Sequence, residues 1–244
     1  MLIIKNLSVQ IESKDILKKI NLKFELGKNY CILWKNWSWK SSLAMTIMWH
    51  PKYLIQNWEL MLGTWKEQIN IFDLKPDERS KLWIFLAFQN IPEIKWVKVF
   101  EFLRSIYDAQ NASQTSFIQF KKIIEPLIEE LSIDREFLRR DLNVWFSGGE
   151  RRKLEILQLK LLKPKYIFLD EIDSWLDVDA FRQVAEMIKW LNSPDNCFII
   201  ITHYFTILDY IPVDRIYVLD KWELSKQWLA EIANQIKNDW FDNL

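Results

Sequence analysis

The sequence predicts an α/β protein with a largely parallel sheet, an antiparallel start and a helical insertion. Three observations lead to this expectation. Apolar strand-like runs alternate with helical patterns through the second half of the chain, which is typical of parallel sheets covered by helices. The first thirty residues alternate between apolar and polar side chains, and the middle of the chain repeats apolar residues at helical spacing.

The elements follow from these patterns in chain order. Residues 2–9 and 20–26 alternate and are followed by a turn at Gly27, so they predict antiparallel strands. The apolar run 30–33 predicts a strand, and 43–48 predicts a helix after an intervening loop.

The middle of the chain, from about 97 to 142, predicts helices because its apolar residues recur every three to four positions. A loop at 143–149, helices at 150–162 and 178–191, and buried strands at 166–169 and 197–202 follow. We expect a single domain over 1–244, with a core at about 1–89 and 150–244 and a helical subdomain at about 90–149.

Composition narrows the class of protein. Lys plus Arg and Asp plus Glu number 33 each, so net charge gives no case for a nucleic-acid partner or an anionic membrane surface. Cys31 and Cys197 lie in apolar runs and are expected to be reduced core residues. The chain has no apolar run of about 18 residues and no leader pattern, so we expect a cytoplasmic protein without membrane insertion.

The loop after the first apolar strand resembles a phosphate-binding loop, whose pattern is G-x-x-x-x-G-K-[ST] between a strand and a helix. Lys40 is expected to reach the phosphates and Ser41 to bind Mg²⁺, while backbone N–H groups cradle the oxygens. Taken alone, Lys-Ser-Ser is more often a solvated helix start. The candidate nucleotide-binding residues are Trp34, Lys35, Asn36, Trp37, Ser38, Trp39, Lys40, Ser41 and Ser42.

A second motif lies 130 residues further on, where the apolar strand 166–169 is followed by Asp170 and Glu171. Asp170 suits a Mg²⁺ ligand acting through water, and Glu171 suits a group that polarises the attacking water. By itself, this pattern is also what a strand end before a charged loop produces by chance. Both motifs follow strand C-termini, where α/β sheets bind ligands, and together they favour a nucleotide site.

A third motif, Ser147, Gly148, Gly149 and Glu150, opens a helix just before that strand. Its simplest interpretation is an N-capped helix, and its alternative is a second anion-binding helix terminus. In this position it resembles the signature motif of ABC-type ATPases. Gln89 and His203 resemble that family's Q-loop glutamine and switch histidine. The D-loop equivalents are Ser174, Trp175, Leu176 and Asp177.

The resemblance implies an ABC nucleotide-binding domain with a RecA-like P-loop core, an N-terminal antiparallel subdomain and an inserted helical subdomain. It implies ATP hydrolysis in which Glu171, His203 and Gln89 are catalytic. It also implies Mg²⁺ held by Ser41, Gln89 and Asp170, with the signature acting in trans across an ATP-dependent head-to-tail dimer.

Within this family the chain is similar to the SufC-type ATPases of the Suf iron–sulfur cluster assembly machinery. The similarity lies in E-x-D-S-x-L-D-x-D-A at 171–180 and T-H-Y at 202–204. It implies SufB- and SufD-like scaffold partners and a conformational change driven by ATP. Two alternatives stay open: the ATPase subunit of an ABC membrane transporter, and a non-hydrolysing pseudo-ATPase.

The second alternative depends on the tryptophans. The chain has 14 Trp and 4 Gly, together 18, whereas average usage predicts roughly 17 Gly. Three indoles at 34, 37 and 39 are expected to fill the phosphate cradle and block ATP. The simplest hypothesis is a gene that reads UGA as glycine, translated with UGA as Trp. Tryptophans at family glycine positions are Trp34, Trp37, Trp39, Trp49, Trp58, Trp83, Trp96, Trp145, Trp175 and Trp222.

Overall fold

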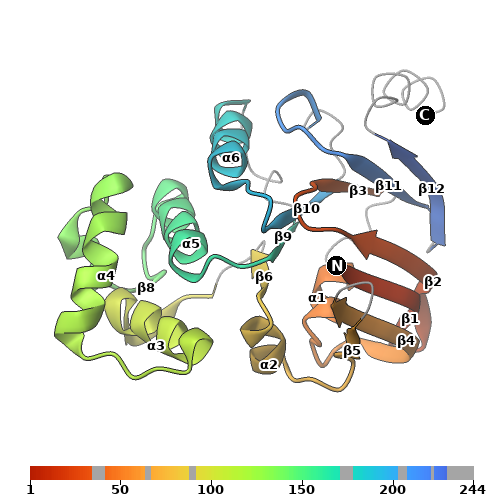
Figure 1. Ribbon diagram of the computed structural model, residues 1–244, viewed down its shortest axis with the longest axis horizontal. Helices are drawn as coiled ribbons and strands as arrows, with labels where there is room; N and C mark the ends of the chain where they lie inside the picture. The colour runs from red at the N-terminus through yellow and green to blue at the C-terminus, as the bar shows by residue number, and fades with distance from the viewer. Residues whose placement is uncertain are drawn as a thin grey trace. The chain divides into compact units, whose positions relative to one another are not determined.

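The computed structural model describes residues 1–34, 42–63, 67–87, 92–170, 178–202, 208–220 and 223–229. The chain forms two compact units, one made of 1–89 and 165–244 and the other of 90–164 (Figure 1). The helical unit therefore continues to Pro164. The sequence prediction assigned the helix at 150–162 to the core, whereas the structure includes that helix in the helical unit.

The first unit begins with a four-stranded antiparallel sheet in the order β2-β1-β4-β5. Buried residues alternate along β1 at Leu2 and Ile4 and again from Leu7 to Ile11, which is the pattern of a strand with one face on a core. The alternation shifts by one residue at 5–6, where the pairing with β2 is irregular. The predicted antiparallel start is confirmed. The strands are β1 (Leu2–Ile11), β2 (Lys14–Phe24), β4 (Leu54–Gly63) and β5 (Gln68–Asn70).

The same unit contains a six-stranded sheet in the order β12-β11-β3-β10-β9-β6. Every pair is parallel except β11 with β12. All residues of β9 and β10 are buried, because parallel strands in the middle of a sheet are covered on both faces. The strands are β3 (Tyr30–Trp34), β6 (Ile84–Ala87), β9 (Tyr166–Asp170), β10 (Cys197–Thr202), β11 (Arg215–Asp220) and β12 (Glu223–Leu229).

The described residues of this unit include three helices. Together with the parallel sheet they confirm the predicted α/β class (Figure 1). The longest, at 178–191, has the bounds that its apolar spacing predicts. The first follows the predicted phosphate loop directly and begins at Ser42. The helices are α1 (Ser42–Ile47), α2 (Pro76–Lys81) and α6 (Val178–Leu191).

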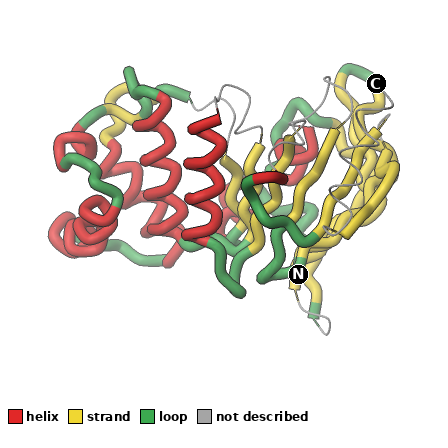
Figure 2. The backbone as a smooth tube through the Cα atoms, turned by 90° about the horizontal axis from the view of Figure 1, so that it is seen from above, coloured by secondary structure: helices red, strands yellow, loops and turns green. Residues whose placement is uncertain are grey.

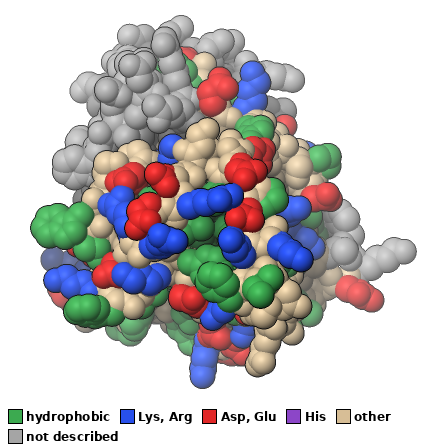
Figure 3. All heavy atoms as spheres, turned by 90° about the vertical axis from the view of Figure 1, so that its left-hand side faces the viewer, with side chains coloured by type: hydrophobic (Ala, Val, Ile, Leu, Met, Phe, Trp, Pro, Cys, Tyr) green, Lys and Arg blue, Asp and Glu red, His purple; other side chains and the backbone are tan. Residues whose placement is uncertain are grey.

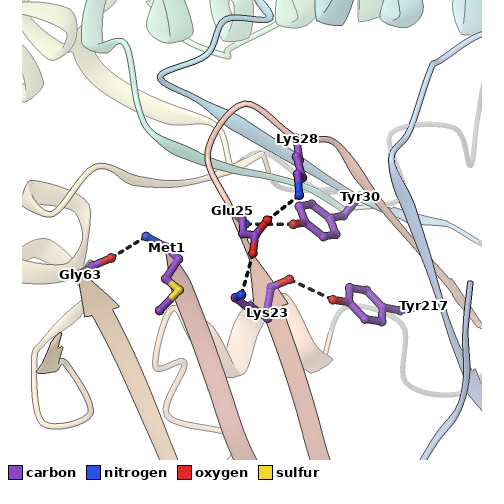
Figure 4. Close-up of polar contacts among 7 residues, drawn as sticks. All are labelled: Met1, Lys23, Glu25, Lys28, Tyr30, Gly63 and Tyr217. Atoms are coloured by element: carbon purple, nitrogen blue, oxygen red, sulfur yellow. Dashed lines mark hydrogen bonds and ion pairs between the residues drawn. The ribbon is translucent and has the colours of Figure 1, made fainter. Parts of the chain in front are cut away.

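A network of polar contacts lies where β2 leads into β3 (Figure 4). The Glu25 carboxylate pairs with Lys23 and Lys28, each at 2.6 Å. The Tyr30 hydroxyl accepts the Glu25 N–H at 3.0 Å, and the Tyr217 hydroxyl donates to the Lys23 carbonyl at 2.9 Å. These contacts, first that with Lys23 and then that with Lys28, lower the pKa of Glu25 to about 2.

The second unit is mainly helical (Figure 2). It has its own core, which includes Phe120, Ile124 and Leu157. The predicted helical stretch is interrupted at 112–116 and at 131–134, and the two strands of a short sheet lie at its two ends. No helix in the described residues of either unit is both long and apolar enough to cross a membrane. The elements are β7 (Ile94–Lys98), α3 (Val99–Asn111), α4 (Phe117–Glu130), η1 (Arg135–Arg139), β8 (Asp141–Leu142) and α5 (Gly148–Leu162).

Candidate functional site

Four neighbouring strands of the parallel sheet end at the same edge of that sheet. The strands are β3, β10, β9 and β6, and they are consecutive in the sheet and parallel to one another. Each strand is followed along the chain by one part of the predicted site. The carboxyl edge of a parallel sheet is where α/β proteins bind their ligands. The topology therefore leads four separate sequence motifs to one edge.

The segments that follow these strands lie outside the described residues, so their predicted roles stay predictions. They are the phosphate loop after β3, Gln89 after β6, Glu171 after β9 and His203 after β10. The predicted D-loop lies outside them as well. The residues concerned are Lys35, Asn36, Trp37, Ser38, Trp39, Lys40, Ser41, Gln89, Glu171, Ser174, Trp175, Leu176, Asp177 and His203.

The described residues beside these segments are positioned by the sheet. Trp34 ends β3, and its backbone is opposite Leu219 of β11. Ser42 begins α1 and is buried. Asp170 ends β9 opposite Ile201 of β10, and its side chain is fully buried. Its place at the carboxyl end of a parallel strand, where α/β sheets bind their ligands, suits the predicted role of a metal ligand.

The predicted signature lies at the start of α5 in the helical unit. Ser147 is the N-cap, and its hydroxyl accepts the Glu150 N–H at 3.2 Å. The Glu150 carboxylate accepts the Ser147 N–H at 2.8 Å, which completes a capping box. Gly148 and Gly149 are exposed, and a side chain added at either would meet no atom within 4 Å. Their N–H groups form an open helix terminus that suits an anion.

Sequence reasoning missed Arg140, which supports the signature from the preceding segment. Its guanidinium pairs with Glu150, donates to the Trp145 carbonyl at 3.1 Å, and lies over the Phe146 ring at 4.4 Å from the centroid. The Ser147 N–H, followed by Arg140, lowers the pKa of Glu150. The ionised capping box is therefore favoured at neutral pH. No motif pointed to Arg140, because the contact depends on how the loop at 141–147 folds.

The backbone angles indicate independently which tryptophans occupy positions suited to glycine. Eight of the 14 have a described backbone, and four of these have a positive φ, whereas only a few per cent of non-glycine residues do. The four are Trp49 (φ 54°), Trp83 (φ 67°), Trp96 (φ 68°) and Trp145 (φ 58°). All four are positions where glycine is expected from the family resemblance. Left-handed backbone is disfavoured for a bulky side chain and costs glycine nothing.

Two of these tryptophans occupy helix ends where glycine is the preferred residue. The Trp49 N–H donates to the Thr46 carbonyl and the His50 N–H to the Met45 carbonyl, each at 2.9 Å. These two bonds form a Schellman motif at the end of α1, and its left-handed position is usually glycine. Trp83 occupies the equivalent position after α2 and donates to the Ser80 carbonyl at 2.9 Å. The local geometry is therefore that of glycine-terminated helices.

Trp96 and Trp145 have left-handed backbones in the helical unit, and their side chains are 90% and 86% exposed. Burial therefore offers little compensation for the backbone strain at either position. Trp58 differs, because it lies within β4 and is buried. Its indole N–H has no hydrogen-bond partner among the described residues, which is costly for a buried donor.

A hollow of about 480 Å³ lies in the helical unit between α3, α4 and η1. Its lining includes the apolar side chains of Phe100 and Ile124 and the ion pair of Lys121 with Glu125 at 3.7 Å. None of the predicted site residues lines it. Acidic and basic side chains are interspersed over the face drawn in Figure 3.

Comparisons with known proteins agree with this arrangement. The profile described as "ABC transporter" matches residues 17–174. The chain is 39% identical to "Probable ATP-dependent transporter ycf16" of Antithamnion sp., covering 100% of this chain and 97% of that protein. It is 36% identical to "Probable ATP-dependent transporter slr0075" of Synechocystis sp., covering 100% and 95%. "Vegetative protein 296" of Bacillus subtilis is also 36% identical, with 99% and 92% covered.

Solved structures share the fold. A dimeric post-hydrolysis state of the ATP-binding cassette MJ0796, bound to ADP and Pi, gives a TM-score of 0.75 at 19% identity, covering 94% of this chain and 99% of that one. The ADP conformation of the cassette MJ1267 gives 0.76 at 19% identity, covering 98% and 95%. The predicted ABC fold is confirmed, and the chain belongs to the ABC transporter family of ATP-binding, ATP-hydrolysing cassettes.

Proposed function

We propose that this chain is the ATPase subunit of a Suf-type iron–sulfur cluster assembly complex, in which it binds Mg-ATP and drives a conformational change of the scaffold. The observation that carries the ATPase part is the convergence of β3, β10, β9 and β6 at one sheet edge. Lys40, His203, Glu171 and Gln89 follow those strands along the chain. The proposal also implies a reducing cytoplasm, which the buried free thiols of Cys31 and Cys197 suit.

The predicted residues fit Mg-ATP chemically. The donor set for Mg²⁺ is the Asp170 carboxylate with the Ser41 hydroxyl and the Gln89 amide, which are all oxygen donors of the kind this cation prefers. Bound Mg²⁺ neutralises developing phosphate charge. Lys40 holds the β- and γ-phosphates, Glu171 orients the attacking water, and His203 contacts the γ-phosphate. Catalysis is then positioning and electrostatic stabilisation.

The exposed signature supports action in trans. The helix terminus at Ser147, Gly148 and Gly149 is open, and the capping box holds it in a helical geometry. In the proposed head-to-tail dimer these N–H groups meet the γ-phosphate bound by the other copy. Glu150 and Arg140 hold the terminus in place before the partner arrives.

The working protein is proposed to carry glycine where this chain has tryptophan in the phosphate loop, signature and D-loop. The left-handed backbones of Trp49, Trp83, Trp96 and Trp145 support this proposal, since they mark positions whose conformation suits glycine. With glycine at 34, 37 and 39 the loop backbone is able to approach phosphate. Lys35 stands where the family resemblance leads us to expect proline, and this change does not explain it.

The Suf assignment rests on the residues at 171–180 and 202–204, which match SufC-type ATPases. The alternative is the ATPase subunit of a membrane transporter, which the names of the relatives from Antithamnion and Synechocystis favour. Both share every nucleotide motif, so the partner decides between them. Co-purification with SufB- and SufD-like proteins supports the first, and co-purification with a permease subunit supports the second.

Nucleotide binding tests the ATPase proposal directly. Calorimetry compares two proteins. One is the literal chain, which has tryptophan at all positions of the given sequence, and the other is the glycine chain, which has glycine in place of Trp34, Trp37, Trp39, Trp145 and Trp175. The glycine chain is expected to bind Mg-ATP and hydrolyse it. Glu171→Gln in that chain is expected to retain binding and slow turnover by about 10²-fold or more. ATP binding by the literal chain would overturn the steric argument, and a glycine chain that binds no ATP would overturn the nucleotide proposal.

A further inference from the structure

Arg79 in α2 is the largest fully buried side chain in the described part of the protein, with 0% exposure. Among the described residues it forms no ion pair with a carboxylate. Its guanidinium instead donates to four backbone carbonyls. Burial lowers the pKa of Arg79 to about 10, so it remains charged at neutral pH.

Two of the four carbonyls belong to the last two residues of α1. The Arg79 Nη1 donates to the Ile47 carbonyl and, at 3.5 Å, to the Thr46 carbonyl. The final carbonyls of a helix have no partner within the helix, and they form the negative end of its dipole. The Arg79 cation donates to the Ile47 carbonyl and adds a second donor to the Thr46 carbonyl, which also accepts the Trp49 N–H. Its positive charge also complements the negative end of the helix dipole. Since α1 has only six residues, it depends on such tertiary contacts to stay in place.

The other two carbonyls belong to the segment that precedes α2. The Arg79 Nε donates to the Leu74 carbonyl at 2.8 Å, and Nη2 donates to the Phe72 carbonyl at 2.5 Å. After α2 the chain enters β6, which ends two residues before Gln89. One side chain thus ties the end of α1 to the segment that leads toward the predicted Q-loop.

The carbonyl contacts do not depend on the tryptophans. The guanidinium also lies over the rings of Trp49 and Trp58, at 5.2 and 5.5 Å from their centroids. Both positions are candidates for glycine in the working protein, where these ring contacts would be absent. The four hydrogen bonds to backbone oxygens remain available in either form.

We propose that Arg79 is a positioning residue for nucleotide binding: it fixes the C-terminal end of α1, and through α1 the phosphate loop that precedes it. This inference rests on the proposed ATPase function. Lys40 and Ser41 directly precede α1 along the chain. A displacement of this short helix therefore moves the point at which the phosphate loop joins it. Nucleotide affinity is the property that depends on this position.

The test compares Arg79→Lys and Arg79→Met with Lys81→Met, a control on the same helix whose side chain is 51% exposed. All are made in the glycine chain. Hydrogen exchange without nucleotide is expected to accelerate about tenfold at 42–49 in Arg79→Lys, with other segments within about twofold. The KM for ATP is expected to rise about tenfold with kcat within about threefold. Arg79→Met is expected to exceed both effects, and Lys81→Met to show neither.

Arg79→Lys keeps the buried positive charge and removes the forked guanidinium contacts. It therefore tests the positioning role even if Arg79→Met does not fold. Exchange that rises equally in all segments, or a kcat that falls with KM unchanged, would assign Arg79 to global stability and overturn the inference. The unsubstituted glycine chain tests the function separately: if it binds no ATP, the ATPase proposal fails. The exchange at 42–49 then shows whether the contact with α1 exists without a nucleotide site.

Discussion

Replacing a strained tryptophan by glycine is expected to stabilise the fold. Trp96→Gly and Trp145→Gly are the clearest changes, because these side chains are 90% and 86% exposed and their backbones are left-handed. Trp190→Gly is the matched control. Trp190 is 48% exposed and lies in α6, where its φ is not positive. Glycine there is expected to destabilise the protein, because it weakens helices.

The magnitude follows from two opposing effects. Left-handed backbone costs a residue with a Cβ about 1–2 kcal/mol, which glycine removes. Glycine also increases the conformational entropy of the unfolded chain, which offsets about 0.5–1 kcal/mol of that gain. The net stabilisation expected at Trp96 or Trp145 is therefore about 0.5–1 kcal/mol. Trp190→Gly in the helix is expected to cost about 1 kcal/mol.

Urea unfolding followed by circular dichroism at 222 nm measures the three variants without relying on tryptophan fluorescence. In a thermal unfolding experiment on a protein of this size, a change of about 1 kcal/mol corresponds to a Tm change of about 2–4 °C. We expect the free energy of unfolding to rise for Trp96→Gly and for Trp145→Gly, and to fall for Trp190→Gly. If all three variants are destabilised alike, the left-handed backbones do not mark glycine positions and the conformational argument is refuted.

Three further predictions concern other contacts of the fold. Glu25→Gln is expected to remove a stabilisation that is fully present above pH 4.5 and is lost as the pH falls toward about 2, because Lys23 lowers the pKa of the Glu25 carboxyl. Acid unfolding of the parent protein and of the variant measures this difference. Ser147→Ala is expected to cost about 1 kcal/mol in urea unfolding, since it removes the hydroxyl that caps α5, and no loss would contradict the capping box. Cys197 is expected to resist a thiol reagent at pH 8 until the protein unfolds, because burial raises the pKa of its thiol; rapid labelling of the native protein would contradict this.

The long elements were predictable from the sequence because their apolar patterns are complete. Both β10 (Cys197–Thr202) and α6 (Val178–Leu191) have the predicted bounds, since a fully buried strand is continuously apolar and a helix on a sheet has an apolar stripe. Short elements carry no such signal. The strand β5 is exposed at all three residues, and α2 has six residues, so neither showed a period.

Side-chain roles that depend on tertiary contacts were not predictable. Arg79 lies in the charged run Asp77-Glu78-Arg79, which looks like a solvated helix face. Only the packing of α2 beside the end of α1 shows that this one charge is buried. The same holds for Arg140. The sequence marked Trp83 and Trp96 only as family glycine positions, and nothing in the neighbouring residues specifies their left-handed backbone.

The identity of the residues at 34, 37 and 39 in the native protein tests the central claim most directly. Peptide mass spectrometry of the protein purified from its own cells reads these positions without assuming a genetic code. The account predicts glycine at all three, and with it an open phosphate loop in front of Lys40 and Ser41. Tryptophan at all three would contradict it, and would leave a member of the ABC family whose phosphate loop is closed to ATP.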